Sequence, residues 1–256
     1  MRENEDFDGP RDEELAAKIE PFDSFWEAPS DVEKGYASFG RFYRHNYLAR
    51  IPQNRAARIL VVSCGPGYFV QLLKDEGYEN ATGIDSSREK IEWGRRRGLD
   101  CRVARVFRFL RESDDPLDLI FCEQEINHLT KSEILAFLEA CRAALRPGGT
   151  LIVHSINGAN PMTGSESRAG NFDHYNSFTE YSLRQILLHA GFRHVEAFPL
   201  HLYVFWTNPL NYVALVVFGV SSLLFRAYFR LVGKDATILT KKIAACGQRP
   251  DAAEAG

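Results

Sequence analysis

Short apolar runs alternate with amphipathic stretches through most of this chain. The runs are rich in Val, Ile, Leu and Phe and are bounded by glycine, proline or polar residues, which is typical of buried strands. The stretches between them repeat apolar residues every three or four positions, which predicts helices. We predict strands at 58–63, 81–85, 101–106, 117–123, 150–156, 192–199 and 236–244. We predict helices at 33–50, 68–76, 86–97, 131–145 and 179–190.

The regular alternation of strand and helix with short turns predicts an α/β fold. Such a chain forms a doubly wound, Rossmann-like and mostly parallel sheet, here of seven strands, with helices on both faces. Residues 1–50 are expected to hold a disordered segment and then an aromatic-rich helix. Residues 51–200 form the main domain, and residues 201–250 add an apolar C-terminal helical insertion and a final strand that completes the sheet.

One segment departs from the soluble pattern. Residues 212–225 carry no charge, and Arg226 and Arg230 follow closely. The uncharged stretch is shorter than the ~20 residues that cross a bilayer. We therefore keep two interpretations, a buried helix or helical hairpin of a small cap, and a helix on a membrane surface whose basic residues reach the lipid headgroups. A membrane span is the least favoured.

Charge and cysteine content narrow the functional classes. The net charge of -3 and the pI of about 6.2 give no basic field, so we expect no nucleic-acid partner. The five cysteines have no metal-ligand spacing, and their odd number argues against a closed disulfide set. We predict no metal site and a reducing, cytoplasmic location, which the acidic N-terminus, unlike a signal peptide, also favours.

A glycine turn and an acidic residue indicate a nucleoside cofactor. Gly65 and Gly67 follow the first predicted strand, where glycine lets a ligand approach the backbone. Asp85 ends the second strand, where a carboxylate accepts hydrogen bonds from ribose hydroxyls. No third glycine completes a G-x-G-x-x-G sequence, which argues against a dehydrogenase.

Several motifs in order resemble the class I S-adenosylmethionine-dependent methyltransferases. The resemblance covers residues 40–200. It rests on SCGPG at 63–67, GIDSS at 83–87, LDLIFCEQEINHL at 117–129, LRPGGTLIV at 145–153 and AGF at 190–192.

The resemblance implies S-adenosyl-L-methionine as the cofactor. The residues that it assigns to the cofactor are Ser63, Cys64, Gly65, Gly67, Tyr68, Asp85, Ser86, Phe107 and Glu123. The sequence departs from the family at Val61, where an acidic residue is usual, and at Ser63, where glycine is usual. The family's acid after the third strand is also missing. These departures keep open a catalytically inactive cofactor-binding or scaffold protein.

Candidate catalytic residues follow the fourth strand and lie in the loop after the fifth. The resemblance places His128 near the transferred methyl group, and its imidazole is suited to accept a hydroxyl proton. Glu125 is a second candidate base, and His174, beside Asp173, is a candidate for contact with the acceptor. His154, at the end of the fifth strand, is a weaker candidate for substrate contact.

The aromatic helix near the N-terminus has two interpretations. Its aromatic residues recur at helical spacing and either pack on the domain or form a lid over cofactor and substrate, with Arg41 or Arg44 near the methionine carboxylate. They are Tyr36, Phe39, Phe42, Tyr43 and Tyr47.

The loop at 171–179 and the apolar tail give a narrower resemblance. They are similar to bacterial methyltransferases associated with glycan and glycolipid synthesis, and to ubiquinone-type O-methyltransferases. This implies O-methylation of a glycan, glycolipid or lipid-linked acceptor, with peripheral membrane contact through residues 201–232. A small aromatic or polyketide-like metabolite is the alternative acceptor. The sequence leaves the oligomeric state open.

Overall fold

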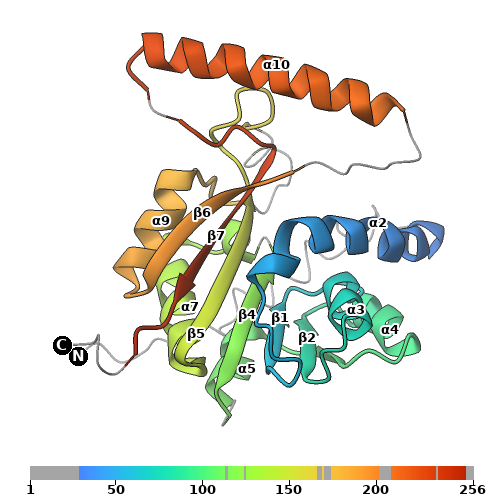
Figure 1. Ribbon diagram of the computed structural model, residues 1–256. Helices are drawn as coiled ribbons and strands as arrows, with labels where there is room; N and C mark the ends of the chain where they lie inside the picture. The colour runs from blue at the N-terminus through green and yellow to red at the C-terminus, as the bar shows by residue number, and fades with distance from the viewer. Residues whose placement is uncertain are drawn as a thin grey trace.

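A seven-stranded sheet forms the centre of the molecule (Figure 1). The computed structural model describes residues 29–112, 115–123, 125–165, 169, 174–201, 209–234 and 236–251. The strand order is β3-β2-β1-β4-β5-β7-β6, which confirms the predicted doubly wound, methyltransferase-like topology. The strands are β1 Ile59–Val62, β2 Ala81–Asp85, β3 Cys101–Val103, β4 Leu117–Glu123, β5 Leu145–Ile156, β6 Arg193–Leu200 and β7 Lys242–Gln248.

The direction of the strands brings their functional ends to one edge. β3, β2, β1, β4 and β5 pair in parallel, and β7 runs antiparallel to both β5 and β6. Ile156, which ends β5, and Leu200, which ends β6, both pair with Lys242 at the start of β7. The connection from β6 to β7 is therefore attached to the carboxyl edge of the parallel strands, where α/β proteins bind their ligands.

Helices cover both faces of the sheet. They are α2 Pro29–Tyr47, α3 Tyr68–Asp75, α4 Arg88–Arg96, α5 Val106–Glu112, α6 Glu125–His128, α7 Lys131–Ala144, α9 Glu180–His189 and α10 Leu210–Leu231, with a 3-10 turn η2 at Leu48–Arg50. Successive residues of β1 point to opposite faces. Val61 joins the core under α2 and α3, whereas Leu60 and Val62 join the core under α5, α7 and α9.

Side-chain caps fix where several helices begin. Ser87 caps α4 by accepting a hydrogen bond from the Lys90 amide. Thr130 and Glu133 form a capping box at the start of α7, and Thr179 forms another with Ser182 at α9. These local signals explain why the predicted starts of the helices agree well with the structure.

Several predicted boundaries were wrong, and for three of them the structure shows the reason. Val106 begins α5 instead of ending the third strand. The 145–149 stretch is the start of β5, where Gly148 has φ 70° and the pairing with β4 shifts register, so this stretch does not merely end the preceding helix. The last strand begins at Lys242 and not at Ala236. Side chains of Asn157, Asn160 and Glu180 bind the backbone between Thr237 and Thr240, so that this backbone makes no sheet pairing.

The apolar C-terminal segment forms one long exposed helix, α10, which lies across the ends of β6 and β7 (Figure 1). The helix continues through Arg226 and Arg230, so the segment is longer than its uncharged part. By length and hydropathy, Tyr212–Leu231 would suffice to cross a membrane, and none of it is buried in the protein. The interpretation as a buried helix or hairpin is therefore wrong. The expectations for residues 1–20 and 202–208 fall outside the described part of the chain.

Candidate active site

The turn after β1 leaves an open space at the carboxyl edge. Ser63, Gly65 and Gly67 all have positive φ, at 53°, 53° and 85°. A Cβ at Gly67 would lie 2.9 Å from the Cys101 sulfur, so this glycine is needed for close packing against β3. A Cβ at Gly65 would meet no atom within 4 Å. The turn is therefore tight on the protein side and accessible at Gly65.

Asp85 joins this turn to the end of β2. Its Oδ2 accepts a hydrogen bond from the Gly65 amide at 2.9 Å, and its Oδ1 accepts one from the Ser87 amide at 2.8 Å. An ionised carboxylate has about four lone-pair sites, so acceptor capacity remains on both oxygens. The side chain is only half-buried, which leaves it accessible to hydroxyl donors.

The helix α2 covers the glycine turn. The Tyr36 hydroxyl donates to the Pro66 carbonyl at 2.7 Å, and burial raises the pKa of Tyr36 to about 12. The ring of Phe39 stacks on Tyr68 with centroids 4.8 Å apart. Gly35 permits this contact, because a Cβ there would lie 2.5 Å from the Tyr68 ring. The aromatic residues expected in this helix thus pack on the domain directly above the turn.

Of the two candidate arginines of α2, Arg44 is paired away from the glycine turn. Arg44 forms an ion pair with Glu76, which follows the C-terminal end of α3, whereas the glycine turn precedes the N-terminal end of that helix. Arg41 is exposed to solvent. The expectation that Arg44 lies near the cofactor's carboxylate is therefore not supported by its ion pair.

The short helix α6 carries the other candidate groups. Ser63 of the glycine turn donates a hydrogen bond to the Glu125 carboxylate at the start of α6. His128, one turn further, lies against His174, with ring centroids 4.7 Å apart and planes at 76°. Residues predicted from three separate segments of the sequence are thus brought together. Asp173 lies outside the described residues.

An amide clamp holds the loop of His174 against α6. The amides of Tyr175 and Asn176 donate to the Asn127 carbonyl, and the Asn127 side chain donates to the Asn176 carbonyl at 3.2 Å. The Asn176 side chain in turn donates to the Leu129 carbonyl. The sequence analysis missed this clamp, since no spacing rule links two asparagines in different segments.

A second pair, formed by a carboxylate and an imidazole, lies beneath α2. Glu123 accepts a hydrogen bond from the Tyr43 hydroxyl, and its Oε1 is 3.4 Å from Nδ1 of His154. Burial raises the pKa of Glu123, and burial together with the nearby Lys242 lowers the pKa of His154 well below its ordinary value. His154 is fully buried below the rings of Phe42 and Tyr47. A substrate reaches His154 only if α2 moves.

Two other predicted cofactor residues differ in exposure. Ser86 is exposed beside Asp85, in the position that the sequence suggested. Phe107 is 5% exposed and packs against Phe137 in the core between α5 and α7, which favours a packing role. Val61, the departure on β1, is fully packed among apolar side chains under α2 and α3.

A model of a methyltransferase domain matches residues 36–197 of the chain. The chain belongs to this methyltransferase family. The curated relatives include a ubiquinone biosynthesis O-methyltransferase from Xylella fastidiosa, 31% identical over 146 residues, which are 55% of this chain and 58% of that protein. Another with the same name, from Caulobacter vibrioides, is 30% identical over 129 residues, 45% of this chain and 50% of that protein. The chain thus matches only about half of the length of these relatives.

Solved structures support the fold of this methyltransferase. A SAM-dependent methyltransferase from Archaeoglobus fulgidus superposes with a TM-score of 0.63 at 16% identity, covering 86% of this chain and 100% of that one. A phosphoethanolamine N-methyltransferase from Haemonchus contortus, in complex with S-adenosyl-L-methionine, gives a TM-score of 0.53 at 15% identity, covering 86% and 58%. The chain therefore carries a methyltransferase domain of the S-adenosylmethionine-dependent class, as the sequence predicted.

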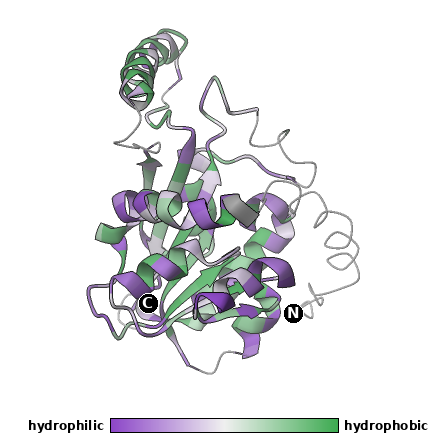
Figure 2. Ribbon diagram, turned by 90° about the vertical axis from the view of Figure 1, so that its right-hand side faces the viewer, coloured by the Kyte–Doolittle hydropathy of each residue, from purple (hydrophilic) through white to green (hydrophobic). Residues whose placement is uncertain are grey.

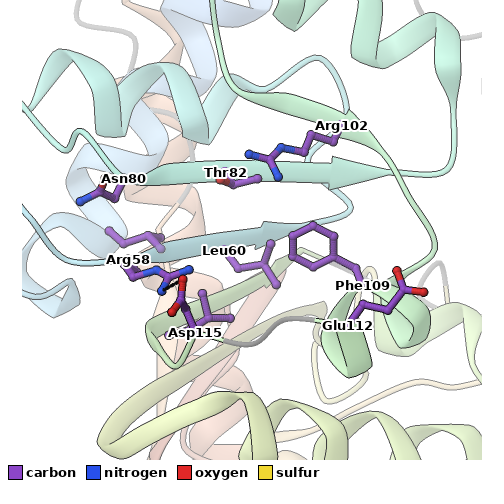
Figure 3. A pocket seen from close by; sticks show the side chains of 10 residues that line it. Arg58, Leu60, Asn80, Thr82, Arg102, Phe109, Glu112 and Asp115 are labelled. Carbon is purple, nitrogen blue, oxygen red and sulfur yellow. Dashed lines mark ion pairs between the residues drawn. The ribbon is translucent and has the colours of Figure 1, made fainter.

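The residues at the carboxyl edge fit this cofactor. The open space at Gly65 suits close approach of a ligand to the backbone, and Asp85 retains acceptor capacity for ribose hydroxyls. A hollow of about 390 Å³ lies elsewhere, beside β1, β2 and α5 (Figure 3). Its lining includes Arg58 and Asn80, which precede strands, and Arg58 is paired with Asp115 at 2.7 Å. This hollow extends toward the opposite edge of the sheet.

Proposed function

We propose that this methyltransferase transfers the methyl group to a hydroxyl oxygen of a lipid-linked or glycolipid acceptor. The observation that carries the proposal is that the candidate site and the apolar helix lie at the same edge of the sheet. The glycine turn, Asp85 and the pair of His128 and His174 lie at the carboxyl ends of the strands, and the apolar helix α10 is attached to that edge.

The cofactor site proposed from the sequence centres on the turn and Asp85. The proposed site comprises Ser63, Cys64, Gly65 and Gly67 of the turn, where a Cβ at Gly65 would meet no atom within 4 Å, together with Asp85 and Ser86 at the end of β2. S-adenosylmethionine supplies a methyl group on a sulfonium sulfur, and the thioether left when the methyl–sulfur bond breaks is a leaving group that needs no activation by the protein. The work left to the chain is to align the acceptor, exclude water and remove one proton.

His128 is the proposed general base. When the methyl group passes to the acceptor oxygen, the hydroxyl proton passes to the imidazole, which is suited to accept it near neutral pH. His174 contacts the His128 ring and is proposed to orient it or to bind the acceptor. Glu125 is held by Ser63, so we assign it to positioning α6 against the turn, with base catalysis as its alternative role.

Two facts support an amphipathic acceptor. The first is that the curated relatives, of which the chain matches about half, carry the name ubiquinone biosynthesis O-methyltransferase. The exposed helix α10 presents apolar surface and is attached to the same edge of the sheet as the site. We therefore propose a cytoplasmic enzyme that is peripheral to the inner face of the membrane.

The test is methyl transfer from tritiated S-adenosylmethionine. The purified enzyme is offered a bacterial membrane lipid extract or catechol, a soluble phenol, and radioactivity is counted in the lipid and phenol fractions. Label in lipid that is lost in Asp85→Ala supports the proposal. Label in catechol alone favours the small aromatic metabolite. No label in either, from a protein that still binds S-adenosylhomocysteine by calorimetry, contradicts both acceptor classes.

A further inference from the structure

The surface of α10 is apolar on the side that faces away from the protein. Figure 2 shows this helix nearly end-on and apart from the body of the molecule. The outward side chains recur at helical spacing and are 57% to 69% exposed, namely Val213, Val216, Val217, Val220, Leu223 and Leu224. The opposite side includes Phe218, Phe225 and Phe229, which are partly covered. A contiguous exposed apolar surface of this length indicates a binding site.

The charged residues of α10 itself have one sign. The sequence has no acidic residue from Ala197 to Lys234, whereas Arg226, Arg230 and Lys234 lie in the last turns of α10 or just after it. At 3.6 residues per turn, Arg226 and Arg230 lie one above the other, on the flank between the outward and inward sides. Cations at this level reach phosphate headgroups while the apolar side enters the acyl layer.

The attachment of α10 argues against a membrane span. Both of its connections return to neighbouring residues, since Leu200 of β6 pairs with Lys242 of β7. A helix of this length, about 33 Å at 1.5 Å per residue, would carry its far end across the bilayer, and the chain would have to return through the hydrocarbon. Backbone without internal hydrogen bonds is not tolerated there.

The segment that leads from α10 back to β7 is also hydrogen-bonded to the body of the protein. The Asn157 side chain donates to the carbonyls of Ile238 and Thr240, and the Glu180 carboxylate accepts from the amide and hydroxyl of Thr237. Arg226 of α10 itself donates to the Thr237 carbonyl at 2.9 Å. These bonds hold the C-terminal end of α10 at the edge of the sheet.

We propose that α10 lies flat in the headgroup region of an anionic membrane and turns the carboxyl edge of the sheet, with the site, toward the lipid. The occupant of the apolar surface is thus the bilayer itself. That the acceptor reaches the site from the membrane rests on the proposed function, whereas the docking of α10 does not.

The first experiment is flotation of the full chain with vesicles. Vesicles of phosphatidylcholine and phosphatidylglycerol should bind the protein, and vesicles of phosphatidylcholine alone should bind it about tenfold more weakly. The variant Val216→Glu/Val220→Glu/Leu223→Glu should lose binding. The matched control Met162→Glu/Tyr181→Glu/Leu188→Glu adds the same charge at exposed apolar residues outside α10 and should bind as the wild type does. The variant Arg230→Gln/Lys234→Gln keeps the bond from Arg226 to the Thr237 carbonyl and should lose the preference for phosphatidylglycerol.

The second experiment measures the orientation of the helix. Val213→Trp and Leu224→Trp are about 16 Å apart along the axis, so brominated lipids should quench both equally in a flat helix and unequally in a span. Unequal depths overturn the proposal. So does a wild type that binds neither vesicle but forms dimers that the triple glutamate variant abolishes, which would make α10 an interface between two copies. Calorimetry with S-adenosylhomocysteine separates these results from failure of the methyltransferase site, since cofactor binding needs no membrane.

Discussion

The hydroxyl of Ser63 donates a hydrogen bond to the Glu125 carboxylate and so ties the glycine turn to α6. Ser63 has φ 53°, a left-handed conformation that costs a residue with a Cβ about 1–2 kcal/mol. The family usually has glycine at this position, where no such cost arises. The hydrogen bond to a charged acceptor offsets the strain, and it places Glu125 and the rest of α6 beside the turn.

Substitution of Ser63 separates these two effects. Ser63→Ala and Ser63→Gly both lose the hydrogen bond to Glu125, but only glycine relieves the left-handed backbone. We expect the glycine variant to be more stable than the alanine variant by about 1 kcal/mol. Urea unfolding of both proteins measures the difference. Equal midpoints and slopes for the two variants would show that the turn does not hold residue 63 at positive φ.

Gly35→Ala tests the docking of α2 on the glycine turn. The new Cβ would lie 2.5 Å from the Tyr68 ring, which is buried between Tyr36 and Phe39, so α2 must shift. We expect destabilisation of about 1–3 kcal/mol, measured by chemical unfolding, and faster proteolysis within α2. If α2 also closes over the cofactor, the affinity for S-adenosylhomocysteine falls in the same variant.

Gly40→Ala is the matched control in the same helix. A Cβ at Gly40 meets no atom within 4 Å, and alanine favours helix over glycine by about 1 kcal/mol. This variant should therefore be as stable as the wild type or more stable. A loss of stability equal to that of Gly35→Ala would refute the role of the Tyr68 contact.

The sequence predicted the parts of the fold that depend on local signals. Glycine at the turns and the alternation of apolar runs are recognised from a few neighbouring positions, and the structure confirms both. The start of β7 depends on distant side chains. Asn157 and Asn160 bind the backbone of residues 238–240, and no local pattern in that segment shows that its hydrogen bonds are already used.

Part of the candidate site could likewise be predicted from local sequence, and part of it could not. Gly65, Gly67 and Asp85 belong to motifs whose spacing is set by one β-α-β unit, so the sequence was sufficient to propose them. The contact between His128 and His174, and the burial of His154 under α2, arise from segments far apart in the chain. Burial decides whether a histidine can contact the substrate, and the spacing of apolar residues in the sequence does not show how deeply these histidines are buried.

His128→Gln is expected to slow methyl transfer with little effect on the cofactor. Loss of a general base costs about 10²–10⁴ in kcat, while the turn and Asp85 are unchanged. Single-turnover assays with the lipid extract measure the rate, and calorimetry with S-adenosylhomocysteine measures binding. His174→Gln should give a smaller loss if it only orients the His128 ring. His189→Gln, at an exposed position on α9, is the control, and a similar loss in that variant would discount the histidine pair.

The buried His154 predicts how stability depends on pH. Burial holds the pKa of His154 below the usual value of about 6.5. Just below pH 6.5 this histidine therefore binds a proton in the unfolded state but not in the folded state. The contribution of His154 to the free energy of unfolding is therefore fully present above about pH 6.5 and is lost as the pH falls below it, by at most about 1.4 kcal/mol per pH unit. In His154→Gln the loss between about pH 6.5 and pH 5 should be smaller. Urea unfolding at several pH values measures it.

Glu123, which pairs with His154 at the ends of β4 and β5, contributes with the opposite sign. Burial raises its pKa, so the folded state keeps a proton that the unfolded state has released, and this contribution to stability grows as the pH falls toward the usual glutamate range. Glu123→Gln removes that gain and should make the acid-side loss of stability steeper than in the wild type. The two variants therefore change the slope in opposite directions. Parallel slopes for both would mean that other carboxylates dominate the titration and that the His154–Glu123 pair is not what sets the acid limit of the fold.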